Sequence, residues 1–217
     1  MQNKYGFNAD EVNLLRRLNT PERLQNFIDE IPYHYQGEDE VTYSPRLVMS
    51  KNQSDCLEGA IFAAAVFRFH GERPLVMNLE AVRDDSHCIA LFERHGCWGA
   101  IGKSKYTGLT FREPIHRTLR ELALSYVEGY FNFDGEKTLR GYSKPFDLSR
   151  FDNTGWMTTE KDITEMGLKI SNIPYTILLT PKQTRGLRAV VPLMLRAGEL
   201  GMTESGILEN AKKKFKA

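Results

Sequence analysis

Hydrophobic positions in the first quarter of the chain predict two short helices followed by a long loop. Between residues 21 and 31, apolar side chains recur at the i, i+3, i+4, i+7 spacing of an amphipathic helix. Thr20-Pro21-Glu22 begins this helix with a hydroxyl cap, a proline and an acid in the first turn. A shorter apolar pattern at residues 12–18 predicts another helix. Residues 33–50 have little periodicity, so we expect a loop with at most a short strand at 41–43.

The middle of the chain predicts one buried helix followed by an antiparallel sheet. Residues 55–70 are apolar on nearly every face, which is typical of a helix inside a protein. Strands are expected at 75–79 and 87–92, and a turn at 95–96 should return the chain through a third strand at 97–101. These elements indicate an α+β fold.

Beyond this core the pattern is weaker. Helical spacing returns at residues 118–131, and a turn-rich segment follows it. The last third carries an apolar run at 177–179 and two expected helices, at 184–197 and 203–215, which glycines separate.

The chain has 217 residues, and its best candidate boundary lies at a turn near residue 154. We expect a domain of residues 1–153, which includes the helical N-terminal segment. Residues 154–217 should form a mostly helical extension packed on the same domain.

Charge and hydropathy narrow the classes of function. With 29 basic against 28 acidic side chains, the chain lacks the basic surplus that drives binding to nucleic acid or anionic lipid. No apolar run reaches the roughly 18 residues of a membrane span, and no signal-peptide core follows the first residues. We therefore expect a cytoplasmic protein with no nucleic-acid and no membrane partner. The pattern does not predict an oligomeric state.

The three cysteines, an odd number without paired short spacing, argue against a disulfide framework and against a zinc site. Cys88 and Cys97 lie near His87 and His95 in the sequence, yet His87 and Cys88 point to opposite faces of one strand. We therefore expect no metal and no cofactor. The remaining question is whether the third cysteine, Cys56, does chemistry.

Cys56 is expected to be the first residue of the buried helix, because Asp55 fits the N-cap and Glu58 its capping-box partner. Unpaired N–H groups at a helix start favour a thiolate, lower the thiol pKa and can stabilise an oxyanion. The negative neighbours Asp55 and Glu58 oppose thiolate formation, unless capping occupies them. Gln53 is a candidate second oxyanion donor, or simply a polar residue before the cap. Taken alone, a cysteine at this position is more often a small buried hydrophobe.

His87 begins the strand that follows the helix and a polar turn. If the helix packs across the sheet, the imidazole lies near the helix N-terminus and takes the thiol proton. Strand alternation places His87, Ile89 and Leu91 on one face, where the two apolar side chains should pack on the alanines of the helix. The alternative is an ordinary histidine at a strand edge with satisfied hydrogen bonds.

Around these two residues the chain resembles a known family. Residues 54–101 contain a cysteine that opens a buried helix, a histidine that opens a strand, and a following strand with tryptophan. In order, these segments are Ser54-Asp55-Cys56-Leu57-Glu58-Gly59-Ala60, Asp84-Asp85-Ser86-His87-Cys88-Ile89-Ala90 and Cys97-Trp98-Gly99-Ala100-Ile101. This order resembles the transglutaminase-like superfamily of the papain-like cysteine-proteinase fold, and the flanks resemble an uncharacterised bacterial group within it.

The resemblance implies a fold in which a buried helix packs on an antiparallel sheet, flanked by helical N- and C-terminal segments. It also implies nucleophilic chemistry at amide or acyl centres, as hydrolysis or as transfer to an amine. Matched to the family motif, Cys56 is the nucleophile that forms a thioester and His87 is the general base. The substrate would be a peptide, a protein or a small amide.

The third catalytic position is where this chain departs from the family. The superfamily expects an acid, sometimes an asparagine, on the strand after the histidine, to hold the imidazole tautomer. The two-residue turn pairs residues whose numbers sum to 191, which puts Ser104 opposite His87. A shift in register puts Lys103 or Gly102 there instead. None of these is a carboxylate, and Asp85 reaches the imidazole only if the strand begins early.

Two hypotheses follow from the sequence. The first is a cysteine-dependent amide hydrolase or acyl transferase, which the intact Cys56–His87 pair favours. The second is a catalytically inactive member that binds a peptide or a partner protein in the old cleft. The missing acid favours this second hypothesis.

Overall fold

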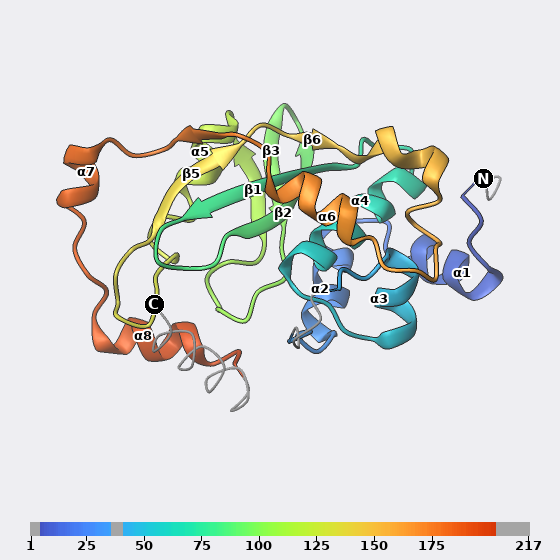
Figure 1. Cartoon of the computed structure of the whole chain (residues 1–217), viewed down its shortest axis with the longest axis horizontal. Helices are drawn as coiled ribbons and strands as arrows, with labels where there is room; N and C mark the ends of the chain where they lie inside the picture. The colour runs from blue at the N-terminus through green and yellow to red at the C-terminus, as the bar shows by residue number, and fades with distance from the viewer. Residues whose placement is uncertain (1–4, 36–40, 203–217) are drawn as a thin grey trace.

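The computed structural model describes residues 5–35 and 41–202, and its fold is α+β (Figure 1). A seven-stranded sheet forms the centre, with the order β4-β3-β2-β1-β5-β7 and the short β6 beside β1. All of its paired strands run antiparallel. The strands are β1 (Leu75–Ala81), β2 (His87–Arg94), β3 (Cys97–Ile101), β4 (Arg112–His116), β5 (Leu139–Ser143), β6 (Phe146–Asp147) and β7 (Tyr175–Ile177).

Helices precede, interrupt and follow the sheet along the chain. They are α1 (Ala9–Arg17), α2 (Pro21–Glu30), α3 (Pro45–Lys51), α4 (Cys56–Phe69), α5 (Leu119–Leu124), the 3-10 helix η1 (Leu148–Thr154), α6 (Thr164–Ser171), α7 (Pro181–Arg185) and α8 (Pro192–Glu199). A serine or threonine cap followed by proline begins α2, α3 and α7. Such a cap satisfies an unpaired N–H group of the first turn, and proline has no N–H to leave unpaired.

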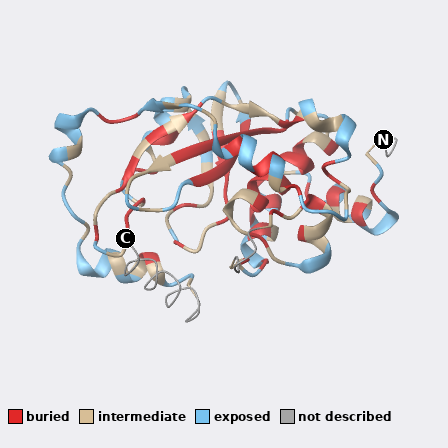
Figure 2. Cartoon of the chain, in the orientation of Figure 1, coloured by how far each residue is buried: buried red, intermediate tan, exposed pale blue. Residues whose placement is uncertain are grey.

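Helix α4 is the buried helix that the sequence predicts, and it starts at Cys56. The expected capping box is present: Asp55 Oδ1 accepts from the Glu58 N–H at 2.8 Å, and Glu58 Oε2 accepts from the Asp55 N–H at 2.9 Å. Every residue from Gly59 to Phe67 is buried, and Figure 2 shows the buried colour concentrated in α4 and the central strands. Because burial of each large apolar side chain stabilises the fold by roughly 1.5–3 kcal/mol, packing holds α4 in place.

Apolar layers cover both faces of the sheet. Cys88, Ala90 and Phe92 of β2 belong to the core that contains α4, whereas Ile89 and Leu91 belong to the core on the α5 side. The expectation that Ile89 and Leu91 pack on the alanines of the helix is therefore wrong. A strand covered on both faces is apolar at successive positions, so its alternation does not identify the face that meets a given helix.

Residues 154–202 add a strand to the sheet as well as helices around it. Strand β7 pairs with the edge of β5, with Thr176 opposite Tyr142. Asn78 of β1 donates its side-chain amide to the carbonyl of Ile170 in α6 at 2.9 Å. In the connection between β3 and β4, the Thr107 N–H donates to the carbonyl of Gly198 in α8 at 3.1 Å.

The expected loop at residues 33–50 contains helix α3 instead. Ser44 caps this helix by accepting from the Leu47 N–H, and Pro45 is its first residue. This is the start signal already seen at Thr20 and Pro21, so the loop prediction overlooked it. Residues 41–43, where at most a short strand is expected, have no regular structure.

Two expected helices are shorter than their apolar patterns. The one at 118–131 ends after α5, and turns follow it. The one at 184–197 is split: α7 ends at Arg185 with Gly186 as its C-cap, and α8 begins with Pro192 as its first residue, a position that suits proline. The helix expected at 203–215 lies outside the described residues. The strand β5 had no sequence signal that we recognised.

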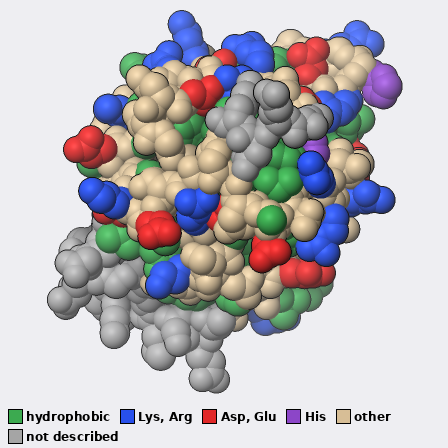
Figure 3. All heavy atoms as spheres, turned by 90° about the vertical axis from the view of Figure 1, so that its right-hand side faces the viewer, with side chains coloured by type: hydrophobic (Ala, Val, Ile, Leu, Met, Phe, Trp, Pro, Cys, Tyr) green, Lys and Arg blue, Asp and Glu red, His purple; other side chains and the backbone are tan. Residues whose placement is uncertain are grey.

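The surface carries mixed charge. Acidic and basic side chains are interspersed over the face shown in Figure 3, in keeping with the near-neutral composition. Within residues 5–35 and 41–202, every helix is too short or too polar to cross a bilayer.

Gly99 of β3 tests the close packing of the sheet. A Cβ atom there would lie 2.4 Å from Phe92 Cζ and 2.8 Å from the Arg112 carbonyl oxygen. We expect Gly99→Ala to lower the free energy of unfolding by about 1–3 kcal/mol through overpacking. Urea unfolding with an unchanged m-value measures this loss.

Gly186 provides the matched control, because its backbone suits alanine and a Cβ there meets nothing closer than 3.5 Å. Gly186→Ala should be neutral or stabilising by about 0.4–1 kcal/mol. Equal effects at the two glycines would contradict the packing described here.

Candidate functional site

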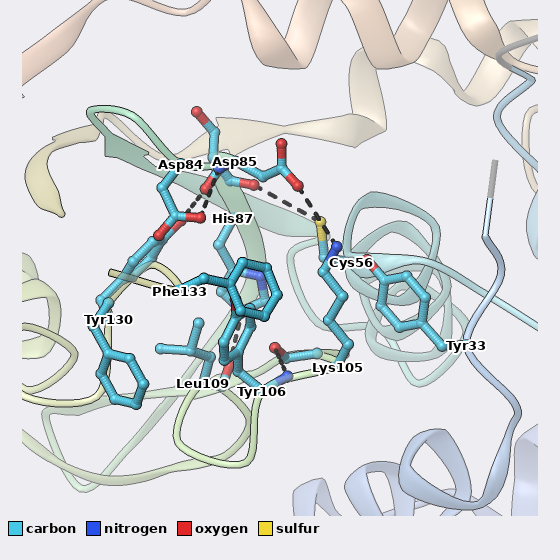
Figure 4. Close-up of a pocket in the computed structure, with 13 residues that line it drawn as sticks. Tyr33, Cys56, Asp84, Asp85, His87, Lys105, Tyr106, Leu109, Tyr130 and Phe133 are labelled. Atoms are coloured by element: carbon cyan, nitrogen blue, oxygen red, sulfur yellow. Dashed lines mark hydrogen bonds and ion pairs between the residues drawn. The ribbon is translucent and has the colours of Figure 1, made fainter. Parts of the chain in front are cut away.

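Cys56 and His87 line one cavity, which we call the Cys56 cavity. The start of α4, the turn before β2, the β3–β4 connection and residues after α5 enclose it, as Figure 4 shows. Its volume is about 60 Å³, room for a few water molecules. The lining residues are Tyr33, Cys56, Asp84, Asp85, Ser86, His87, Ser104, Lys105, Tyr106, Leu109, Tyr130, Phe131 and Phe133.

Glu58 fixes the position of Cys56 through the start of α4. Its carboxylate is fully buried and accepts from the Asp55 N–H at 2.9 Å and from the Tyr43 N–H at 2.7 Å. It also lies 2.9 Å from Nδ1 of His34, whose ring stacks on Tyr43. Burial, followed by the negative charge of Asp55, raises the pKa of Glu58, and these hydrogen bonds oppose the rise.

The Cys56 thiol is a poor acid in this setting. Burial raises its pKa to about 12, with a further contribution from the charge of Asp55 and a smaller one from Asp85. A hydrogen bond from the Cys88 N–H and the positive charge of Lys105 act in the opposite direction. The helix start predicts a lowered pKa, which the negative neighbours Asp55 and Glu58 oppose. In the structure, burial and the charge of Asp55 outweigh the effect of the helix start.

The Cys56 sulfur lies 4.0 Å from the Ser86 carbonyl oxygen, which is a weak contact. Tyr33 lines the cavity beside Cys56 (Figure 4). Burial, followed by electrostatic repulsion from Cys56, Asp55 and Asp85, raises the pKa of Tyr33, so it remains a neutral hydroxyl.

His87 is held by a backbone carbonyl in place of an acid. Its Nε2 lies 2.8 Å from the carbonyl oxygen of Leu109, so Nε2 donates and Nδ1 is left as the acceptor. Burial lowers the pKa of His87 to about 4; the Leu109 carbonyl opposes the fall, and the charge of Arg112 adds to it. At neutral pH the thiol and the imidazole are therefore both uncharged.

The register predicted for the hairpin is confirmed, but the ladder ends before it reaches His87. Arg94 pairs with Cys97 and Ala90 with Ile101, each pair summing to 191, and β3 ends there. The chain then turns away at Gly102, where a Cβ would lie 3.1 Å from Nε2 of His87. Because Gly102 has no side chain, the β3–β4 connection passes close to the imidazole and places the Leu109 carbonyl within hydrogen-bonding distance of it.

The other candidate residues occupy different positions from those expected. Ser104 lines the cavity, but its hydroxyl accepts from the Tyr106 N–H at 2.9 Å. Asp85 also lines the cavity and pairs with Lys105 at 3.6 Å. Gln53 is not among the lining residues. Sequence reasoning missed Leu109, because a backbone acceptor has no residue type to search for.

Arg112 holds the loop that presents Leu109. Its guanidinium donates to the carbonyl of Gly108 at 2.8 Å and to the Ser125 hydroxyl at 3.1 Å. It also lies 3.8 Å from the centre of the Tyr126 ring, a cation–π contact. These contacts fix the residue directly before Leu109 and thereby orient the imidazole.

No group of three or more His, Cys, Asp or Glu side chains arranged to hold a metal occurs among the described residues. All three cysteines are free thiols, and Cys88 is buried against the α4 side of the sheet. Comparison with known proteins adds no identification: no protein-family model matches the chain, and no curated protein matches it.

The pH dependence of Cys56 alkylation tests the raised thiol pKa. Because the pKa lies near 12, the thiolate fraction should grow about tenfold per pH unit between roughly pH 7 and pH 10. Iodoacetamide rates at Cys56, followed by peptide mass spectrometry, should rise without a plateau over this range. A plateau near pH 7 would mean that the N–H groups at the helix start lower the thiol pKa more than burial raises it.

The buried neutral imidazole predicts an acid-sensitive fold. The pKa of His87 falls from 6.5 to about 4, so the unfolded chain binds a proton below about pH 6.5 that the native protein does not. Stability should drop between pH 6.5 and pH 4 by up to about 3 kcal/mol from this group. Urea unfolding of the wild type and of His87→Gln at both ends of this range should show a weaker pH dependence in the variant. An identical dependence would contradict the assignment.

Proposed function

We propose that the chain is a cysteine-dependent amide hydrolase or acyl transferase with a transglutaminase-like fold. The observation that carries this proposal is the joint position of Cys56 and His87 in one cavity, with Nε2 of His87 tied to a carbonyl. That bond leaves Nδ1 as the only imidazole nitrogen able to accept a proton. The substrate would be a peptide, a protein or a small amide.

The uncharged resting pair favours proton transfer during attack. As the sulfur of Cys56 bonds to the substrate carbonyl carbon, its proton passes to Nδ1 of His87 and the carbonyl oxygen gains the negative charge. When the C–N bond breaks, the imidazolium returns the proton to the leaving amine, and an acyl thioester remains. Water or a second amine then attacks the thioester, and the thiol is regenerated.

A catalytic acid beside the histidine would have two roles: to hold the imidazole tautomer and to stabilise the imidazolium. The Leu109 carbonyl can fill only the first. It holds the imidazole tautomer, but it carries no full charge to stabilise the imidazolium. The positive charge of Arg112 opposes imidazolium formation as well. We therefore expect slower catalysis than a carboxylate in this position would give.

The arrangement of elements supports the proposed family. The chain has a cysteine at the first residue of a buried helix, a histidine at the first residue of the second strand and an antiparallel sheet beneath them. The three free thiols are suited to a reducing compartment, so we also propose a cytoplasmic location.

A catalytically silent binding protein is the second candidate. Two observations favour it: the Cys56 thiol is a weak acid, and no carboxylate contacts His87 among the bonds found in the described residues. In that case the cavity would hold a peptide end or a partner side chain without changing it.

An activated ester distinguishes the two candidates. In the proposed enzyme, p-nitrophenyl acetate should acetylate Cys56 and release nitrophenol in a burst, which intact-mass spectrometry and absorbance detect. His87→Ala should slow the burst by about 10²–10⁴-fold, because a general base typically contributes this much.

Cys97→Ser is the control, since Cys97 is the other partly exposed thiol and lies outside the cavity. It should leave the burst unchanged. Acetylation that is equally fast in the wild type and in His87→Ala would exclude the proposed mechanism and favour the binding protein.

A further inference from the structure

We propose that the mouth of the Cys56 cavity is a cation subsite, built from the Asp85 carboxylate and the Tyr33 ring and now filled by the ammonium group of Lys105. By exchange with Lys105, it would select substrates that carry an ammonium group close to the reacting carbonyl. The inference rests on the proposed function, because it assigns a substrate class to the same site.

Lys105 shows what the subsite binds. Its Nζ lies 3.6 Å from an Asp85 carboxylate oxygen and 5.9 Å from the centre of the Tyr33 ring. A carboxylate and a ring face are the two groups that attract an ammonium ion most directly. Figure 4 shows the lysine side chain extending toward Asp85, with its end drawn beside Cys56.

Exposure indicates which partner can be exchanged. The Lys105 side chain is only 13% exposed, whereas the Asp85 side chain is 60% exposed. A ligand that arrives from solvent therefore meets the carboxylate first. Lysine has a long and flexible stem, so its ammonium can move out to water while the carboxylate stays on its turn.

The charge around the cavity favours a cation over an anion. Asp84 and Asp85 line it and Asp55 adjoins Cys56, whereas Lys105 is the one lysine or arginine among the lining residues and His87 is uncharged at neutral pH. An incoming carboxylate would add to a surplus of negative charge. An incoming ammonium reduces that surplus, or replaces Lys105 without changing it.

The wall of the cavity extends the same preference inward. Tyr106, Tyr130, Phe131 and Phe133 line it, and their rings provide apolar area and further electron-rich faces. An ammonium joined to a short apolar stem fits this combination. The cavity of about 60 Å³ restricts the part that enters to a few atoms, unless the walls move.

The charge of small thiol reagents tests the inference without knowledge of the natural substrate. The probes are methyl, 2-aminoethyl and 2-sulfonatoethyl methanethiosulfonate, reacted with the full chain carrying Cys97→Ser. Each rate at Cys56 is divided by the rate of the same reagent with 2-mercaptoethanol, which removes intrinsic reactivity. The thiolate fraction is the same for all three probes, so their ratios report the subsite alone.

We expect the aminoethyl reagent to react about tenfold faster than the methyl reagent after this correction. Lys105→Met should increase this preference, because it empties the subsite. Asp85→Asn should bring the ratio close to one. Glu165→Gln is the matched control: it removes an exposed acid of α6 that does not line the cavity, and it should leave the ratio unchanged.

Three results would overturn the inference. The first is equal corrected rates for all probes, and the second is failure of every probe to modify Cys56. The third is a preference for the sulfonatoethyl reagent that Lys105→Met removes, which would make Lys105 a receptor for anions. Acetylation of Cys56 by p-nitrophenyl acetate is measured separately, so the proposed function can stand when the cation subsite fails.

Discussion

The buried carboxylate of Glu58 is the interaction on which the site depends. A carboxylate removed from water must have its oxygen atoms hydrogen-bonded, and this one is satisfied by three segments at once. The Asp55 N–H belongs to the helix start, the Tyr43 N–H to the segment before α3, and His34 to the chain after α2. Because the next residues of the same helix are packed into the core, the first turn of α4 cannot shift without breaking this set. Because Cys56 is the first residue of α4, the hydrogen bonds of Glu58 also fix its position.

The same burial that positions the reactive groups also keeps them uncharged. A thiol and an imidazole in a cavity lined by protein atoms and acidic side chains both favour their neutral forms, so the site is not a preformed ion pair. In the proposed mechanism, the thiol proton moves only when a substrate carbonyl is attacked. In the proposed cation subsite, a substrate ammonium beside Asp85 would keep the local potential close to the one that Lys105 now provides.

The α+β core and the joint position of Cys56 and His87 could be predicted from the sequence, because both follow from local rules. The capping box, the apolar run of α4 and the hairpin register each depend on residues close together in the chain. Other features depend on distant contacts. The strand β5 pairs with β1 and β7, which flank it only after folding, and the pKa of Cys56 is set mainly by burial, which exists only in the folded chain. Helix α3 is different, since its Ser44–Pro45 start was readable and was overlooked.

The bond between His87 and the Leu109 carbonyl has a consequence for how this protein can change during evolution. A backbone acceptor is present whatever side chain stands at position 109, so no point mutation there deletes it outright. Substitutions at position 109 are therefore constrained only by the packing of the side chain, and they leave the imidazole tautomer unchanged. The vulnerable positions are those that shape the loop. They are Gly102, where a Cβ would lie only 3.1 Å from both the ring and the Leu109 carbonyl oxygen, and Arg112, which anchors the neighbouring carbonyl. Selection on the imidazole would thus be visible in the path of the main chain rather than in the identity of a third catalytic residue.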